Sequence, residues 1–217
     1  MDARVELEAL RKTFVQTKRR GLRRELTEIV AVDGVSLSIA GQSVAFIGPN
    51  GAGKSTTIKM LTGILLPTSG TARVLGLTPW HERPTLARHI GAGFGQRSQL
   101  WYHLPPRDTF EVLARVYDLD SAKYVRQRDT LIERFGLGPF LDLPVRKLSL
   151  GQRMRAEIAA SLLHAPKVLF LDEPTIGLDV VARQELRDLI REWNREEGMT
   201  VFLTSHDAGD IEGSLAG

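Results

Sequence analysis

The sequence contains no cysteine, so neither disulfide bonds nor thiolate metal ligands are available to it. Its five histidines show no spacing that pairs them as metal ligands. No apolar run approaches the roughly 18 residues of a membrane-spanning helix, and the first residues lack the apolar core of a signal peptide. A net charge of +3 is too small to indicate nucleic-acid binding by itself. These absences predict a cytoplasmic protein, and 217 residues with 42% hydrophobic content suit one globular unit.

What the sequence does contain is a glycine-rich stretch between an apolar run that reads as a strand, 44–47, and a helical pattern, 57–61. A strand, a glycine-rich turn and a helix N-terminus in this order form the context of a P-loop, whose backbone N–H groups cradle phosphates. Lys54 would place an ammonium on the β- and γ-phosphates, and the Ser55 hydroxyl would ligate Mg²⁺. An ordinary glycine turn is the alternative, and chance alone gives the pattern in roughly one such chain in a hundred. The candidate phosphate-binding residues are Gly48, Pro49, Asn50, Gly51, Ala52, Gly53, Lys54, Ser55 and Thr56.

Strand and helix patterns alternate along the chain. Alternating or continuous apolar runs predict strands at 5–9, 35–39, 44–47, 71–75, 90–94, 167–171 and 201–203. Apolar residues at helical spacing predict helices after the P-loop, from about 149 to 162 and across 186–193. From about 106 to 144 only the helical pattern occurs, which predicts a helical insertion. Strands that alternate with helices imply an α/β fold with a largely parallel sheet.

A basic stretch follows the first predicted strand, with no acidic residue before Glu25. We expect residues 18–24 to form a mobile, solvated loop. A contact with anionic lipid headgroups is the alternative. The basic residues are Arg11, Lys12, Lys18, Arg19, Arg20, Arg23 and Arg24.

Polar side chains follow three of the predicted strands. Asp172 ends an apolar strand, where ligands dock in open α/β sheets, and its carboxylate can hold Mg²⁺ through water. Glu173 would orient or deprotonate the attacking water, although a helix-capping turn is the alternative. Gln96, at another strand end, would reach both Mg²⁺ and this water, unless it is a plain loop amide. His206 follows the last strand and would donate a hydrogen bond to the γ-phosphate, although a lone histidine is more often structural.

A second candidate anion site lies at the start of a predicted helix. Ser149 and Gln152 have the spacing of a capping box, and the free N–H groups of a helix start attract anions. A plain capped helix is the alternative. The candidate binding residues here are Ser149, Leu150, Gly151 and Gln152.

Taken in order, these motifs resemble the ATP-binding subunit of ABC transporters over nearly the whole chain. The nearest resemblance is to the ATPase components of bacterial exporters of the drug-resistance and polysaccharide type. Its most specific part is Ser-x-Gly-Gln shortly before an apolar strand that ends in Asp-Glu-Pro. The resemblance implies a P-loop NTPase core with a mostly parallel sheet, an N-terminal antiparallel β part and an inserted helical subdomain. One ATP-binding domain would span 1–217, with an α/β core of about 1–96 and 165–217 and a helical subdomain of about 100–164.

The resemblance also assigns roles to the candidate residues, with ATP and Mg²⁺ as the cofactors. Glu173, His206 and Gln96 would be catalytic, and Ser55, Gln96 and Asp172 would hold the metal. Residues 149–152 would contact the γ-phosphate of ATP held by a partner subunit, so that two chains sandwich two nucleotides. Leu150 stands where the family more often has glycine, whereas Gly151 is kept.

One aromatic residue, Phe14, looks like the family's adenine-stacking residue, and core packing is the alternative. The implied partners are transmembrane permease subunits and a second ATPase subunit, identical or paralogous. The implied location is the cytoplasmic face of the cell membrane, reached by association, and no nucleic-acid partner is expected. Family members usually continue after the histidine with a helix and further strands, so we expect the C-terminal end to be truncated.

The leading hypothesis is therefore an ATPase coupled to transport through separate membrane subunits. A soluble relative that acts on DNA or ribosomes usually carries a coiled-coil or zinc insertion, or two cassettes in one chain. This class is disfavoured, because the sequence has one cassette, no cysteine and only a short helical insertion. A catalytically silent binding subunit is disfavoured by Glu173 and His206. A GTPase is disfavoured because no Asn-Lys-x-Asp motif is present.

Overall fold

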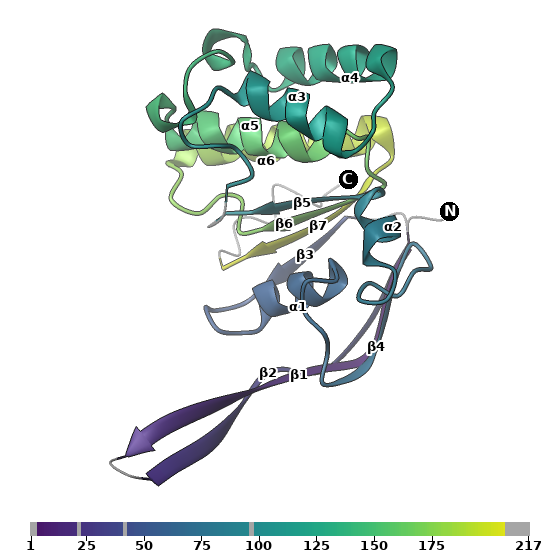
Figure 1. Ribbon diagram of the computed structural model, residues 1–217, viewed down its shortest axis with the longest axis vertical. Coiled ribbons are helices and arrows are strands. Elements are labelled where there is room, and N and C mark those ends of the chain that lie inside the picture. The colour runs from purple at the N-terminus through teal and green to yellow at the C-terminus, as the bar shows by residue number, and fades with distance from the viewer. Residues whose placement is uncertain (1–3, 21–22, 41–42, 96–97, 207–217) are drawn as a thin grey trace.

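The computed structural model describes residues 4–20, 23–40, 43–95 and 98–206 (Figure 1). The strands are β1 (Arg4–Arg20), β2 (Arg23–Ala40), β3 (Val44–Ile47), β4 (Ser69–Val74), β5 (Ile90–Phe94), β6 (Val168–Asp172) and β7 (Thr200–Ser205). The helices are α1 (Lys54–Leu61), α2 (Arg83–Ala87), α3 (Pro106–Val116), α4 (Ser121–Arg134), α5 (Leu150–Leu162) and α6 (Val180–Glu197), with short 3-10 helices η1 (Gly138–Phe140) and η2 (Val145–Lys147). No helix within these described ranges combines the length and apolar character needed to cross a bilayer.

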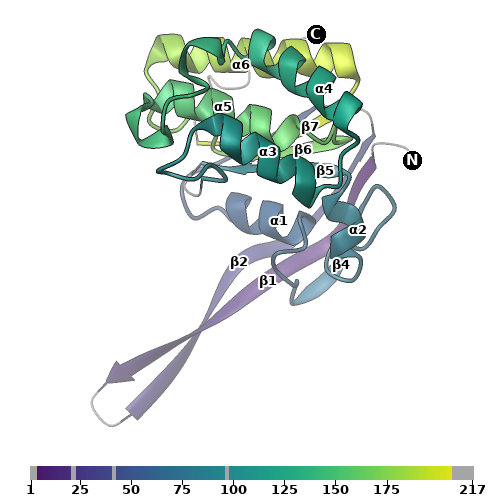
Figure 2. The same ribbon diagram turned by 45° about the horizontal axis from the view of Figure 1, so that its top comes forward.

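Two sheets organise the molecule. A parallel sheet has the order β3-β7-β6-β5, and an antiparallel sheet has the order β2-β1-β4. Helices α3 to α6 lie on one side of the parallel sheet, and α1 lies on its other side, toward the antiparallel sheet (Figures 1 and 2). Because both faces of the parallel sheet are covered, its strands are apolar along their length, as β6 with buried Val168–Leu171 illustrates. The expected α/β fold with a parallel sheet and an N-terminal antiparallel part is confirmed.

Alternate residues of the parallel strands face two separate hydrophobic cores. Leu169 and Leu171 of β6 pack in a core with apolar residues of the helical layer, such as Phe110 of α3. Phe170, between them in sequence, packs instead in the core that contains residues of α1, β1 and β4. Successive side chains of a strand point to opposite faces of the sheet, and this alternation divides them between the two cores. It holds the carboxyl ends of the strands, where the candidate site lies, between two packed layers.

The insertion between β5 and α5 is helical, as its apolar spacing predicts. Asp120 caps α4, since its carboxylate accepts a hydrogen bond from the Lys123 N–H at 2.9 Å. Helix α2 was not expected, because it contains only five residues and presents a single buried residue, Leu86. So short a segment shows no helical period in sequence.

The first two strands are much longer than predicted. They pair in antiparallel register from Arg4 opposite Ala40 to Arg20 opposite Arg23. Strand β4 pairs with β1 only between residues 5 and 11. Beyond it the two strands continue as a two-stranded ribbon that projects from the body of the molecule (Figures 1 and 2). We call its end, residues 13–20 and 23–30, the hairpin end.

The expectation of a loop is therefore wrong for residues 18–20 and 23–24, whereas residues 21 and 22 lie outside the described ranges. Residues 18–20 and 23–24 are strand residues, paired across the hairpin. Lysine and arginine carry a weak strand signal in sequence, and ladder hydrogen bonds depend on a distant partner rather than on local preference. The pairing that begins in the core-facing part of the strands extends outward through the basic residues.

Candidate active site

The glycine-rich stretch connects β3 to the N-terminus of α1, as predicted, and two of its glycines have left-handed backbones. The φ angles of Gly51 and Gly53 are 88° and 84°. A Cβ on Gly53 would also lie 2.1 Å from the backbone oxygen of Ala31 in β2. Both the conformation and the close approach therefore require glycine at position 53.

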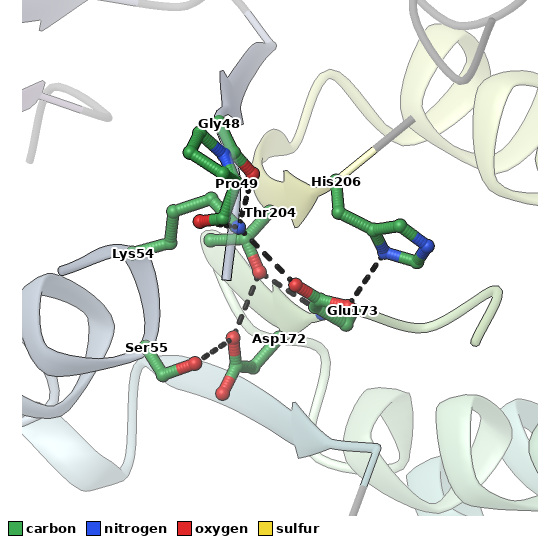
Figure 3. A network of polar contacts seen from close by, with 8 residues as sticks. All are labelled: Gly48, Pro49, Lys54, Ser55, Asp172, Glu173, Thr204 and His206. Atoms are coloured by element: carbon green, nitrogen blue, oxygen red, sulfur yellow. Dashed lines mark hydrogen bonds and ion pairs between the residues drawn. The ribbon is translucent and has the colours of Figure 1, made fainter. Parts of the chain in front are cut away.

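The Lys54 side chain is only 6% exposed and lies under the loop (Figure 3). Its Nζ donates hydrogen bonds to the carbonyl oxygens of Gly48, at 2.5 Å, and Pro49, at 3.1 Å. The same Nζ lies 3.3 Å from Oε1 of Glu173. A buried ammonium is stable only when it is hydrogen-bonded and paired. Here the loop carbonyls and the carboxylate that follows β6 satisfy it together.

A chain of three side chains joins α1, β6 and β7. The Ser55 hydroxyl donates to Oδ1 of Asp172 at 2.8 Å, and the Thr204 hydroxyl donates to the same oxygen at 2.8 Å (Figure 3). Asp172 and Thr204 stand opposite each other in the parallel register of β6 and β7. The two strand ends therefore fix the carboxylate against the first turn of α1.

The next residue, Glu173, leaves the strand in a left-handed conformation, with a φ of 51°. Its backbone N–H donates to the Thr204 hydroxyl oxygen at 3.0 Å. Its Oε2 lies 2.9 Å from Nδ1 of His206, and its Oε1 faces Lys54. Strained backbone in a residue other than glycine persists where surrounding contacts fix it, and such residues cluster at functional sites.

A cavity of about 540 Å³ opens over this network. Its volume lies within the range of about 300–1,000 Å³ that small-molecule sites occupy. Its lining combines backbone and side chains of the glycine-rich stretch with the carboxylates after β6. The residues that line it are Ala31, Asn50, Gly51, Ala52, Gly53, Lys54, Ser55, Thr56, Lys59, Ile64, Phe94, Gly95, Asp172, Glu173 and Ile176.

The donors in this cavity are of the kind that Mg²⁺ prefers. The Ser55 hydroxyl and the Asp172 carboxylate already share a hydrogen bond, so one ion can contact both groups. The described residues contain no group of three or more histidine, cysteine or acidic residues that would hold a metal alone. Such a group is not required, because Mg²⁺ is commonly held by one or two protein oxygens together with substrate phosphates.

Residues 149–152 lie at the N-terminus of α5 and are not among those that line this cavity. The predicted capping box is present: the Gln152 N–H donates to Ser149 Oγ at 3.2 Å, and the Ser149 N–H donates to Gln152 Oε1 at 2.9 Å. Leu150 is half exposed, and its side chain lies against Gly177 in the loop between β6 and α6. The structure therefore places this stretch outside the chain's own phosphate cradle.

The predicted roles of two further candidates, Phe14 and Gln96, are not tested by the geometry of the site. Phe14 lies in the hairpin end, paired with Ile29, and is 39% exposed. It belongs to neither hydrophobic core, and the Lys12 ammonium lies 5.2 Å from its ring centroid. Gln96 lies outside the described residues. The adenine-stacking role of Phe14 and the metal and water contacts of Gln96 stay predictions.

Sequence reasoning missed two contributors to the site. Thr204 anchors both acidic residues, and the signal for it was available, since Asp172 and Thr204 each stand near the end of a predicted parallel strand. Ala31 lines the cavity from β2. Nothing in the local sequence indicates this, because the contact depends on how the antiparallel sheet packs against the loop.

Behind the cavity, the buried carboxylate of Glu157 connects α5 to the segment that follows Gln96. It accepts hydrogen bonds from the Ser98 hydroxyl and from the Gln99 N–H, the latter at 2.9 Å. Burial raises the pKa of Glu157, and these hydrogen bonds and Arg153 oppose the rise. Helix α5 is thereby tied to residues 98 and 99.

Comparison with known proteins gives matches over most of the chain. Residues 32–176 match the family described as ABC transporter. The daunorubicin/doxorubicin resistance ATP-binding protein DrrA of Streptomyces peucetius is 40% identical over 81% of this chain and 53% of its own length. The lantibiotic transport ATP-binding protein SrtF of Streptococcus pyogenes is 36% identical over 90% of this chain and 82% of its own length. The chain thus spans about half of DrrA and most of SrtF.

A solved structure shows the same architecture. The ATP-binding cassette MJ0796, in a dimeric post-hydrolysis state bound to ADP and Pi, superposes with a TM-score of 0.79 at 26% identity. The match covers 97% of this chain and 91% of that one. This similarity extends over both sheets and the helical layer.

Proposed function

The chain belongs to the ABC transporter family, and from this premise we propose that it binds ATP with Mg²⁺ and hydrolyses it to drive transport through partner transmembrane subunits. The observation that carries the proposal is the polar network that joins Lys54, Ser55, Asp172, Glu173 and Thr204 beneath the glycine-rich loop. It brings a phosphate-binding cation, metal-binding oxygens and a candidate base to one edge of the sheet. Phosphoryl transfer requires these three parts.

The triphosphate would lie against the N-terminus of α1. There the inward-turned N–H groups of the loop and the positive end of the helix attract anions. Ser55 and Asp172 would hold Mg²⁺, which neutralises charge on the β- and γ-phosphates when bound. Gln96 would complete this set from the end of β5.

Glu173 is the proposed general base. In this structure its carboxylate pairs with Lys54 on one oxygen and with His206 on the other. A γ-phosphate in the cradle competes with Glu173 for the Lys54 ammonium, which leaves one carboxylate oxygen available to a water molecule. Glu173 then accepts a proton of this water as its oxygen attacks the γ-phosphorus, while the bond from phosphorus to the bridging oxygen breaks and ADP leaves with that oxygen. His206 orients the carboxylate and donates a hydrogen bond to the γ-phosphate.

We propose that residues 149–152 act on the nucleotide of a second subunit. Their position at the N-terminus of α5, away from the residues that line this chain's cavity, supports that role. Two subunits, identical or paralogous, would sandwich two ATP molecules. The whole chain, 1–217, would form one ATP-binding domain whose helical part is about residues 100–164, and Phe14 would stack on adenine. Association with the permease would place the domain on the cytoplasmic face of the membrane.

The decisive experiment compares Glu173→Gln with Lys54→Ala in nucleotide-binding and ATPase assays. Glu173→Gln keeps the shape of the side chain and removes the base, so ATP and Mg²⁺ should bind while turnover is lost. Lys54→Ala removes the main cation of the cradle and should abolish nucleotide binding. Turnover within about threefold of wild type in Glu173→Gln would show that another group activates the water. Wild-type affinity in Lys54→Ala would refute the phosphate cradle.

A separate experiment distinguishes transport from a role on DNA or ribosomes. Tagged protein purified from detergent-solubilised membranes should carry with it a membrane-spanning subunit with several helices. Recovery with ribosomes or DNA, and not with such a subunit, would contradict the transport role while leaving the ATPase proposal intact.

A further inference from the structure

The hairpin end takes no part in either hydrophobic core or in the cavity, yet the pairing of β1 with β2 continues along it. From residue 13 outward, β1 pairs with β2 alone among the described residues, because its pairing with β4 stops at residue 11. Eight residue positions at about 3.3 Å each give a ribbon about 25 Å long. An isolated two-stranded ribbon of this kind is only marginally stable in water. Its persistence beyond the body points to a function at its end.

The register places like charges opposite each other at residues 18–20 and 23–24, which we call the tip of the hairpin. Arg19 pairs with Arg24 and Arg20 pairs with Arg23, while Lys18 pairs with Glu25. Like charges at directly opposed positions destabilise an antiparallel ladder. Two consecutive arginine pairs are therefore a local conflict with the fold, and conflicts of this kind mark functional positions. An anionic surface would relieve both pairs.

Apolar residues occur in the same part of the ribbon. Val15 and Leu26 are 62% and 68% exposed, and Val30 is also exposed. In the alternation of an antiparallel pair, Val15, Leu26 and Val30 share one face of the ribbon, next along the chain to the basic residues. Exposed apolar residues beside clustered cations are the combination that binds a lipid surface, where headgroups meet the cations and acyl chains meet the apolar groups.

We propose that the hairpin end binds the surface of a membrane that contains anionic lipids, independently of any permease. The tip carries five cations, Lys18, Arg19, Arg20, Arg23 and Arg24, and no acidic residue between them. Charge complementarity with anionic headgroups selects the surface, and the exposed aliphatic residues favour lipid, whose acyl chains can cover them, over RNA. The contact would orient the ATP-binding subunit at the membrane before and during its association with partner subunits.

The test is co-sedimentation of the purified chain with vesicles of phosphatidylcholine alone or mixed with phosphatidylglycerol, without nucleotide and without permease. Each cation near an anionic surface changes binding by about fivefold, so Arg19→Ser with Arg24→Ser should weaken partition to the anionic vesicles at least about tenfold. The matched control, Arg126→Ser with Arg195→Ser, removes two exposed arginines elsewhere and should leave partition within about twofold of wild type. An equal loss of vesicle binding in both double variants would show that only the net charge of the chain matters, which would overturn the proposal.

A second pair of variants tests the apolar part. Leu26→Ser should weaken partition several-fold, whereas Val116→Ser, at a residue of equal exposure, 68%, on α3, should not. For wild type, high salt should reduce partition steeply, since screening weakens contacts between exposed charges. Equal partition of wild type to neutral and anionic vesicles would overturn the proposal without any variant.

Three controls distinguish lipid binding from a folding defect, from a role in the nucleotide site and from nucleic-acid binding. Thermal unfolding and ATP binding of the hairpin variants should match wild type, because the substituted residues lie outside both cores and the cavity. Loss of ATP binding in these variants would place Arg19, Arg24 or Leu26 in the nucleotide site, beside the proposed adenine contact of Phe14, and overturn the proposal. Binding of single-stranded RNA that depends on Arg19 and Arg24, with no such dependence for vesicles, would assign the tip to nucleic acid instead. Vesicle binding is measured without nucleotide, so a failure to hydrolyse ATP would not change it. The ATPase proposal and the membrane-binding proposal can therefore be refuted independently.

Discussion

Thr204→Val tests whether the buried hydroxyl of Thr204 is the anchor of the site. Valine keeps the branched shape but removes the donor to Asp172 Oδ1 and the acceptor of the Glu173 N–H. The Thr204 side chain is fully buried, so water cannot replace the lost partner at that position. A hydrogen bond to a charged group contributes about 1.5–3 kcal/mol and one to a backbone amide about 1 kcal/mol. The free energy of unfolding should therefore fall by about 2–4 kcal/mol.

The matched control is Thr204→Ser, which keeps the hydroxyl and loses one methyl group, at a cost of about 1 kcal/mol. For a chain of this size 1 kcal/mol changes the melting temperature by about 2–4 °C, so valine should lower it by about 5–15 °C and serine by about 2–4 °C. Circular dichroism melts of both variants measure this difference. An ATPase assay should show a larger loss for valine, since the backbone of Glu173 is no longer held. A valine variant that melts at or above the serine variant would refute the reasoning.

Three further predictions concern the loop, the second subunit and pH. Gly53→Ala should lose nucleotide affinity in a fluorescent-nucleotide titration, because its Cβ would lie 2.1 Å from a backbone oxygen of β2. Gly51→Ala should lose less affinity, because nothing lies within 4 Å of a Cβ at that position. Equal losses of affinity in the two variants would contradict this prediction. Lys54→Ala and Gly151→Asp should each abolish ATPase activity, and mixing them should restore part of it; background activity with mixed dimers present in native mass spectra would favour the plain capped helix. Burial lowers the pKa of His164 below its ordinary 6.5, so the unfolded chain binds its proton more readily and stability is lost as pH falls from 6.5 toward the lowered value. Chemical denaturation of His164→Gln should show a weaker loss than wild type in this window, and an unchanged loss would assign it to other groups.

The sequence predicted those parts of the site that local context determines. A glycine-rich turn between an apolar strand and a helix predicts a phosphate cradle, and the structure places Lys54 and Ser55 in the first turn of that helix, beneath the glycine-rich turn. Asp172 and Glu173 were predicted for the same reason, since parallel strands bring their carboxyl ends to one edge. The capping box at Ser149 and Gln152 was also recognised from spacing alone. What these groups do chemically stays a prediction.

What the sequence did not indicate depends on pairing between distant segments. Residues 18–20 and 23–24 of the hairpin end were predicted to form a loop, because their ladder is defined by residues on the opposite strand rather than by local preference. Thr204 was missed because its importance lies in the register between β6 and β7. The close approach of Ala31 to Gly53 follows from sheet packing, which no local pattern encodes.

The division of the parallel strands between two cores has a consequence for cooperativity. Leu169 and Leu171 belong to one core and Phe170 to the other, and β7 divides Val201 and Phe202 in the same way. Neither core can lose its packing without exposing the opposite face of the same strands. The helical layer and the α1 layer should therefore come apart in a single all-or-none transition rather than as separate foldons. Among the described strands, β1 and β2 alone have a long segment outside both cores, the hairpin end, and this segment is free to open locally while the two cores stay packed.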